Sequence, residues 1–194
     1  VLIWRFGLPS LNLLRFQFRV ERLQPETASA TSVYITGNNL KNWPVKPGQY
    51  VLVRFLSKRF IWQEHPFSLS AVPVDNTFRL TIRSLGDYTG IIPHLKPGTR
   101  VLVSGPFGRF TSDIAQTKKR LFIAGGVGIT PLGTLLRQAL NDGIDCTLIY
   151  GNRTLEDVIF KQELAQLKPA GLKLFPVFSS PAKDYKGETG YIDG

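Results

Sequence analysis

Sulfur-containing side chains are nearly absent from the sequence, which has one cysteine, Cys146, and no methionine in 194 residues. A single cysteine excludes a disulfide framework, and it excludes any metal or iron–sulfur site built from cysteines alone within these residues. Cys146 falls inside a predicted strand, which indicates a buried and unreactive thiol. Because methionine is missing altogether, we expect the sequence to be part of a longer chain.

Histidine is scarce as well, and His65 and His94 are the two in the sequence. A haem held by two imidazoles needs a pair of facing histidines. We therefore expect no haem and no other metal site within these residues, and any haem that takes part in the function is expected in a domain outside them.

Long apolar runs are also missing, because no stretch reaches the about 20 residues that a helix needs to cross a bilayer. The apolar opening, residues 1–14, is interrupted by Arg5, Pro9 and Asn12. Trp4 and Arg5 beside apolar residues suit a membrane interface, and the alternative is a hydrophobic leader packed on the first strand. We expect residues 1–13 to be a juxtamembrane-like leader.

Acidic residues are outnumbered by basic ones, and the formal net charge is +10. This excess suits nucleic acid, an anionic membrane surface or anionic ligands. The tight basic groups are Lys58-Arg59 and Lys118-Lys119-Arg120, and no DNA- or RNA-binding motif accompanies them. A basic balance alone is only an electrostatic footprint, so nucleic acid is not an expected partner.

Short strands and Pro-Gly turns fill the first half of the sequence. Apolar and polar residues alternate over residues 14–20 and again over 78–83, which is the pattern of half-buried strands. Two Lys-Pro-Gly turns precede apolar stretches at 50–55 and 100–104. With one short helical candidate, at 88–95, the pattern predicts an antiparallel barrel or sandwich, and we expect a Greek-key β-barrel over residues 14–113.

The second half alternates strands with helices, which predicts a Rossmann-like parallel α/β domain over residues 119–194. The helix at 155–167 is expected to start with a capping box at Thr154. We expect this domain to be incomplete at its C-terminal end, because three parallel strands make a small sheet. The predicted strands are 121–124, 146–150 and 172–178, and the predicted helices are 131–140 and 155–167.

A glycine-rich loop joins the first of these strands to its helix. Three glycines allow a ligand to approach the main chain closely, and Thr130 and Pro131 suit the N-cap and the first helical position. Uncapped amides at a helix N-terminus bind anions, so the pyrophosphate of a dinucleotide is the expected occupant. The spacing G-G-x-G-x-T-P differs from the dinucleotide fingerprint, and a plain tight turn is the alternative. The loop residues are Gly125, Gly126, Val127, Gly128, Thr130 and Pro131.

Three further stretches carry candidate ligand-binding groups. In the first, Phe67 suits stacking on a flat heteroaromatic ring and Ser68 suits a hydrogen bond to its edge, whereas a core phenylalanine and a satisfied serine are the alternative. Arg83 offers a cation close to the hydroxyls of Tyr88 and Thr89, a second place for a pyrophosphate. The third, residues 105–110, is a rigid turn between aromatic residues, with a plain β-turn as the alternative.

These stretches, in this order and spacing, resemble the dehydrogenase half of ferric reductases and NADPH oxidases, a branch of the ferredoxin–NADP reductase superfamily. The resemblance runs from about Arg15 to the last residue. The motifs that carry it are His65-Pro-Phe-Ser68, Gly86-Asp-Tyr-Thr89, Gly105-Pro-Phe-Gly108 and Gly125-Gly-Val-Gly-Ile-Thr-Pro131.

The resemblance implies an FAD-binding barrel followed by a domain that binds NADPH or NADH. By similarity, His65, Pro66, Phe67 and Ser68 hold the isoalloxazine ring, with Ser68 as the catalytic residue near the atom that accepts the hydride. Arg83, Tyr88 and Thr89 are similar to residues that hold the FAD pyrophosphate, and the loop of residues 125–131 to those that hold the pyrophosphate of NAD(P)H. Arg153 lies where such enzymes meet the adenosine ribose, and it suits a 2′-phosphate or is a solvated turn residue.

The expected function is transfer of a hydride from NAD(P)H to FAD, followed by transfer of single electrons to an acceptor. We expect the acceptor to be haem in an upstream membrane domain, and this module to lie at the cytoplasmic face of a membrane. The alternatives are a soluble flavin reductase that serves an oxygenase or iron–sulfur partner, and a flavin- or nucleotide-binding module without catalysis. The family's Cys-Gly-Pro stretch and terminal aromatic residue are absent, so we expect an incomplete nicotinamide pocket.

Overall fold

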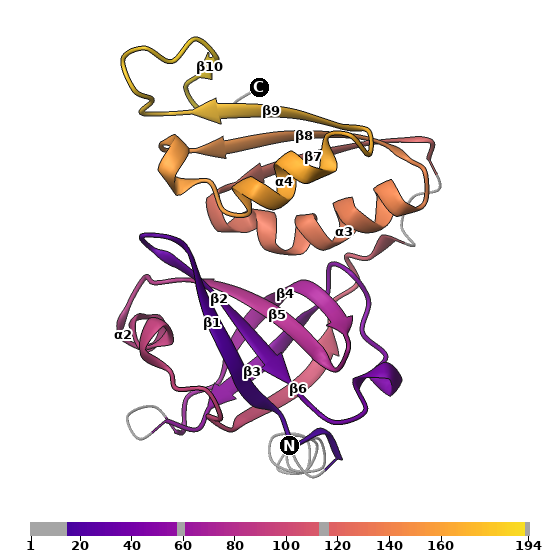
Figure 1. Ribbon diagram of the computed structural model, residues 1–194, viewed down its shortest axis with the longest axis vertical. Coiled ribbons are helices and arrows are strands. Elements are labelled where there is room, and N and C mark those ends of the chain that lie inside the picture. The colour runs from indigo at the N-terminus through magenta and orange to yellow at the C-terminus, as the bar shows by residue number, and fades with distance from the viewer. Residues whose placement is uncertain (1–14, 58–60, 113–116, 193–194) are drawn as a thin grey trace.

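The computed structural model describes residues 15–57, 61–112 and 117–192. The predicted leader, residues 1–13, lies outside the described residues. The described chain forms two sheets with two helices between them, an antiparallel barrel and a parallel sheet (Figure 1). This confirms the predicted fold class, and the two sheets are separated in sequence between Phe107 and Lys119.

The barrel is a six-stranded antiparallel sheet within the described residues, with strand order β1-β2-β5-β4-β3-β6. Backbone hydrogen bonds from Val20 N to Thr99 O (2.9 Å) and from Val101 N to Phe18 O (3.0 Å) join its first and last strands and close it. The strands are β1 (Arg19–Thr27), β2 (Ala30–Thr36), β3 (Tyr50–Phe55), β4 (His65–Val74), β5 (Thr77–Arg83) and β6 (Val101–Phe107).

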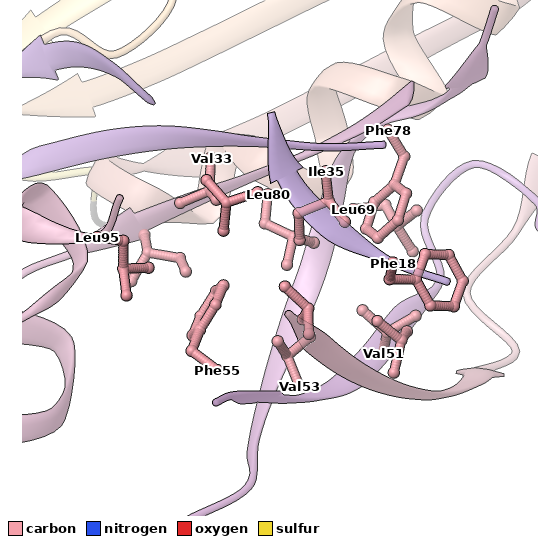
Figure 2. Close-up of a cluster of buried hydrophobic side chains, with 14 of the residues drawn as sticks. Phe18, Val33, Ile35, Val51, Val53, Phe55, Leu69, Phe78, Leu80 and Leu95 are labelled. Atoms are coloured by element: carbon pink, nitrogen blue, oxygen red, sulfur yellow. The ribbon is translucent and has the colours of Figure 1, made fainter. Parts of the chain in front are cut away.

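Alternation along the strands places one set of apolar side chains inside the barrel. Val33 and Ile35 of β2, Val51 and Val53 of β3 and Leu80 of β5 are each 0% exposed. Figure 2 shows these side chains meeting in one cluster with Phe18, Phe55 and Phe78. The interior is therefore filled by side chains, and any ligand must bind outside it.

The predicted first strand starts later than expected. Gln17 adopts a φ of 50°, so β1 begins at Arg19, although Phe16 and Phe18 are buried as the alternation predicted. The predicted helix at 88–95 is also divided, into α2 (Asp87–Gly90) and the 3-10 turn η3 (Ile92–His94). Another 3-10 turn, η2 (Leu40–Asn42), precedes β3.

The second sheet is parallel, and its order in the described residues is β10-β9-β8-β7. Helices α3 and α4 cover the face of this sheet that is turned toward the barrel (Figure 1). Phe122 and Ala124 of β7 are buried, whereas Leu121 and Ile123 are exposed on the opposite face. The elements are β7 (Lys119–Gly125), η5 (Gly126–Gly128), α3 (Ile129–Asn141), β8 (Asp145–Asn152), η6 (Leu155–Asp157), α4 (Lys161–Leu167), β9 (Leu172–Phe178) and β10 (Glu188–Thr189).

Two predictions for this domain were wrong in detail. The single helix at 155–167 is instead η6 and α4, separated by extended Val158 and by Phe160 in the left-handed region at φ 61°. Ile159 and Phe160 are each 2% exposed, so the chain turns here to bury both. The expected capping box at Thr154 does not form, because its hydroxyl bonds to the Asp157 carboxylate at 3.2 Å.

No helix within residues 15–57, 61–112 and 117–192 has both the length and the apolar character that are required to span a bilayer.

Candidate functional site

The first motif lies on β4, which starts at His65 as predicted. Phe67 pairs with Val51 of β3, which points into the barrel, and its half-buried ring packs against the barrel core. Ser68 leaves the opposite face of the strand, since successive side chains alternate. Pro66 is exposed, and no hydrogen bond joins the half-buried Ser68 hydroxyl to another described side chain.

The two edges of β4 differ in their pairing over residues 65–68. β3 pairs with β4 over these four positions, whereas the described part of β5 pairs with β4 only from Leu69 onward. The edge that faces away from β3 is therefore open at the motif. Phe67 packs toward the barrel core while Ser68 leaves the other face, so the shared contact of these two side chains with one flat ring stays a prediction.

His65 and Tyr88 close one end of this open edge. Their ring centroids are 3.9 Å apart with an angle of 33° between the planes. The Tyr88 hydroxyl donates to the Val53 carbonyl oxygen at 3.3 Å, and Tyr88 is 6% exposed. Burial raises the pKa of Tyr88, which keeps its hydroxyl protonated as a donor. Tyr88 thus supports His65 from inside the barrel, and its predicted contact with a pyrophosphate stays a prediction.

Thr89 closes the loop that follows β5. Its hydroxyl accepts a hydrogen bond from the Leu85 amide at 2.8 Å and donates to the Gly86 carbonyl oxygen at 3.3 Å. The hydroxyl therefore stabilises the conformation of this loop. A phosphate that contacted the Thr89 hydroxyl would have to share it with the Leu85 amide and the Gly86 carbonyl oxygen. The predicted role of Thr89 at the FAD pyrophosphate stays a prediction.

Aromatic residues flank Ser68 on the other side of β4. Tyr50 of β3 pairs directly with Ser68, and Phe107 of β6 pairs with Tyr50. The Tyr50 and Phe107 ring centroids are 5.7 Å apart, and Tyr50 is 37% exposed. Sequence reasoning noted Phe107 but missed Tyr50, and the register across three strands is what brings both to Ser68.

The glycine-rich loop connects β7 to α3, as predicted. A Cβ placed on Gly125 or Gly128 would meet nothing within 4 Å, so a ligand can reach the backbone there. α3 begins at Ile129, with Gly128 at its N-cap and no side-chain cap among the described residues. The Ile129 amide already donates to the Gly126 and Val127 carbonyl oxygens, so the amides suited to an anion are those of the preceding 3-10 turn η5, whose N-cap Gly125 has no side chain to cap them.

Thr130 was expected to be the N-cap and is not. It lies inside the helix, where its hydroxyl donates to the Val127 carbonyl oxygen at 3.0 Å, and Pro131 is the third helical residue. The helix starts earlier because the 3-10 turn η5 leads directly into it. Thr130 shapes the loop, and its contact with a ligand stays a prediction.

Tyr150 supports the loop from beneath, and sequence reasoning missed it. It is 1% exposed, and its hydroxyl donates to the Gly126 carbonyl oxygen at 3.0 Å. Burial raises the pKa of Tyr150, so the hydroxyl stays a donor at physiological pH. A tyrosine at the end of a buried strand, next to the glycine loop, was the available signal.

A pocket of about 310 Å³ is lined by Arg83 of the barrel and by the glycine-rich loop, whereas residues 65–68 do not line it. It lies at the carboxyl ends of the parallel strands, where open α/β sheets bind ligands. Arg83, from the end of β5, enters this pocket, and its Nη1 lies 3.7 Å from the position of a Cβ on Gly126. Arg83 was assigned to the FAD pyrophosphate, and the structure places its guanidinium between the barrel and the glycine loop.

Arg153 lines the same pocket, and an acidic residue accompanies it. The Arg153 side chain is 75% exposed, and its Nε lies 3.6 Å from the Asp157 Oδ2. The remaining wall comes from the β1–β2 turn, the end of β9 and the segment after β10. These lining residues are Thr27, Ser29, Val127, Gly151, Asn152, Ile159, Ser179, Gly190, Tyr191 and Ile192.

Comparisons with known proteins match both halves of the chain. An FAD-binding domain model matches residues 17–111, and an oxidoreductase NAD-binding domain model matches residues 122–194. A flavohemoprotein from Candida albicans is 35% identical over 150 residues, which cover 74% of this chain and 38% of that protein. NADH-cytochrome b5 reductase 2 from Neurospora crassa is 33% identical over 114 residues, which cover 56% of this chain and 33% of that protein.

A solved structure agrees over most of the chain. The cytochrome b5 reductase domain of Ulva prolifera nitrate reductase gives a TM-score of 0.78 at 21% identity, covering 94% of this chain and 80% of that one. At 21% sequence identity, this structural similarity shows the fold alone. The chain spans less than half of each of the two curated relatives.

Proposed function

The chain belongs to the ferredoxin–NADP reductase superfamily, as an FAD-binding domain followed by an oxidoreductase NAD-binding domain, and from this premise we propose how it works. It is a flavin- and NAD(P)H-binding oxidoreductase module for electron transfer. The proposal concerns the residues that carry the reaction, the nucleotide used, and the acceptor.

The residues present fit both cofactors. For FAD, the open edge of β4 and the Ser68 hydroxyl supply a slot with a free hydrogen-bonding group. For NAD(P)H, the amides of the η5 turn and the space above Gly125 and Gly128 supply a phosphate cradle. The observation that carries the proposal is the shared pocket, because Arg83 of the barrel and Gly126 of the loop line it together.

When bound, the two cofactors supply the hydride donor and the hydride-accepting ring. Ser68 would hold the edge of the flat ring through its hydroxyl, and Tyr50, which pairs with Ser68, would limit the access of water beside it. The amides of the η5 turn would bind the negative pyrophosphate, and Arg83 adds a positive charge between the two sites. Tyr150 keeps the loop in place by binding the Gly126 carbonyl oxygen.

The experiment that tests this function is anaerobic mixing of the FAD-loaded protein with NADPH or NADH. Bleaching of the oxidised flavin absorbance supports the proposal. A Ser68→Ala variant is expected to bind FAD and to be reduced about 10–100-fold more slowly, as for removal of one positioned donor. A protein that binds FAD and is bleached by neither nucleotide overturns the proposal and favours a binding module without catalysis.

For the nucleotide, we propose NADPH as the preferred donor, with NADH accepted. Arg153 is exposed and lines the pocket, where a guanidinium pairs a 2′-phosphate. Asp157 opposes this preference, because a carboxylate at this position suits the free ribose hydroxyls of NADH. The ratio of kcat/KM for the two nucleotides tests the preference, and a ratio in favour of NADH overturns it.

For the acceptor, we propose haem in an upstream membrane domain of the ferric reductase or NADPH oxidase type, with this module at the cytoplasmic face. The support is the excess of positive charge and the apolar, Trp- and Arg-containing composition of residues 1–13. The test is the coding sequence upstream of Val1. Several apolar segments of about 20 residues with spaced histidine pairs support the proposal, and a soluble domain there favours the soluble reductase instead.

A further inference from the structure

An ionic cluster joins the nucleotide-binding domain to the strand that carries the flavin motif. Glu163 of α4 pairs with Arg79 of β5 and with Arg137 of α3, each with an N–O distance of 2.5 Å. Both guanidinium groups also donate to the Ser70 carbonyl oxygen on β4, Arg79 at 3.3 Å and Arg137 at 3.4 Å. Two strands of the barrel and two helices of the nucleotide domain thus meet at one carboxylate and one carbonyl.

Phe160 lies beneath the same two arginines. Its ring centroid is 4.4 Å from the Arg79 Cζ and 5.6 Å from the Arg137 Cζ, within reach of cation–π attraction. Phe160 also has a left-handed backbone at φ 61°, which a bulky residue seldom adopts. The surrounding packing must hold this conformation. We name Arg79, Arg137, Phe160 and Glu163 the interdomain clamp.

The charges of the clamp depend on one another. The Arg79 side chain is 5% exposed and that of Glu163 is 34% exposed. Burial alone raises the pKa of Glu163, but hydrogen bonds and charge from Arg79 and Arg137 outweigh burial and hold that pKa below its usual range. Loss of the carboxylate would leave a buried cation beside a second cation, so the interface would have to shift to readmit water.

The clamp acts close to the flavin motif. Ser70, whose carbonyl oxygen accepts from both arginines, lies two residues after Ser68 on β4, at an irregularity in the β4–β5 register between Leu69 and Ala71. A second contact lies nearby, since the Gly48 amide donates to the Thr134 Oγ1 of α3 at 2.9 Å. Helix α3 is therefore fixed to the barrel on one side while its N-terminus forms the phosphate cradle.

We infer that Glu163 is a positioning residue, which through the interdomain clamp sets the distance between the Ser68 edge of β4 and the nucleotide loop at the start of α3. The inference rests on the proposed function, because the distance matters for hydride transfer. Transfer between two bound rings is sensitive to small displacements, and a shift of about 1 Å in such a geometry lowers the rate by about 100-fold.

The test is the Glu163→Gln variant, which keeps the shape of the side chain and removes its charge. At saturating NADPH, the rate constant of flavin reduction is expected to fall at least about tenfold, while the dissociation constants of FAD and NADPH change less than about twofold. The Glu163→Asp variant is expected to recover part of the rate. Asp184→Asn is the matched control, because it removes an exposed carboxylate from the same domain.

A second measurement needs no cofactor. Hydrogen exchange of the Gly48 amide, which donates across the interface, is expected to speed up by about tenfold in Glu163→Gln, with the amides of core residues Leu80 and Leu148 unchanged. Unchanged Gly48 exchange together with an unchanged reduction rate overturns the inference. Equal acceleration at Leu80 and Leu148 also overturns it, because the variant then weakens the whole fold. If the unmodified protein binds FAD but is reduced by neither nucleotide, the proposed function fails, whereas the exchange result still tests the clamp.

Discussion

Tyr150 controls the shape of the nucleotide loop through a single hydroxyl. We expect Tyr150→Phe to lose about 1 kcal/mol of stability, because the Gly126 carbonyl oxygen loses one of its donors and keeps the Ile129 amide. Since the loop then relaxes, NADPH affinity is expected to weaken by about threefold to tenfold. Nucleotide titration and thermal unfolding measure both effects.

Tyr185→Phe is the matched control for this hydroxyl. Tyr185 also donates to a backbone carbonyl, that of Pro176 at 3.4 Å, and it does not line the pocket. If both variants weaken NADPH binding equally, the proposed role of Tyr150 in the loop is wrong.

Arg153 and Asp157 favour different nucleotides, because a guanidinium suits the 2′-phosphate of NADPH and a carboxylate suits the free ribose hydroxyls of NADH. Arg153→Ala is expected to lower kcat/KM for NADPH by about tenfold and to change that for NADH little, since one exposed charge pair with the 2′-phosphate is lost. Asp157→Asn is expected to move the NADPH:NADH ratio in the other direction. Steady-state kinetics with both nucleotides measures the ratios, and equal losses for the two nucleotides in Arg153→Ala would contradict the assignment.

At the scale of elements, the turn before β3 has no room for a side chain. Gly48 has a φ of 88°, and a Cβ there would lie 2.0 Å from the Phe110 carbonyl oxygen. Gly48→Ala is therefore expected to destabilise the fold by about 2–4 kcal/mol, from backbone strain and the clash together. Chemical denaturation measures the change.

The second Lys-Pro-Gly turn supplies the control for Gly48. Gly98 has nearly the same φ, 85°, but a Cβ there would meet nothing within 4 Å. Gly98→Ala is expected to cost about 1 kcal/mol, because it adds strain without a clash. Comparable losses in the two variants would show that the contact with Phe110 contributes nothing.

The sequence predicted the elements whose cause is local. Alternating residues such as Phe18 and Val20 predicted the barrel, and the glycine loop predicted the turn into α3. The break between η6 and α4 was not predictable from local pattern, because Phe160 adopts its left-handed backbone to reach Arg79, 81 residues earlier in the numbering. The open edge of β4 was not predictable from local pattern either, because it depends on the position at which the pairing between β4 and β5 ends.

At the scale of the whole molecule, one carboxylate couples the docking of the domains to pH. Glu163 has a pKa lowered in the folded protein by Arg79 and Arg137, against the opposing effect of burial. Its ordinary value in an unfolded chain is about 4.3. A group with a depressed folded pKa stabilises the fold fully above its unfolded pKa, and this contribution is lost as pH falls through the folded value.

The comparison of the unmodified protein with Glu163→Gln isolates this contribution from those of the other acidic residues. At pH 7 we expect the variant to be less stable by about 1–2 kcal/mol, a value kept below that of a fully buried pair because the Glu163 side chain is 34% exposed. The difference is expected to stay constant down to about pH 5 and to shrink below about pH 4, as the carboxyl is protonated first in the unfolded chain and then, at lower pH, in the folded protein. Urea denaturation of both proteins across this range measures it. A difference that persists undiminished at the lowest pH would mean that the charge of Glu163 is not what holds the two domains together.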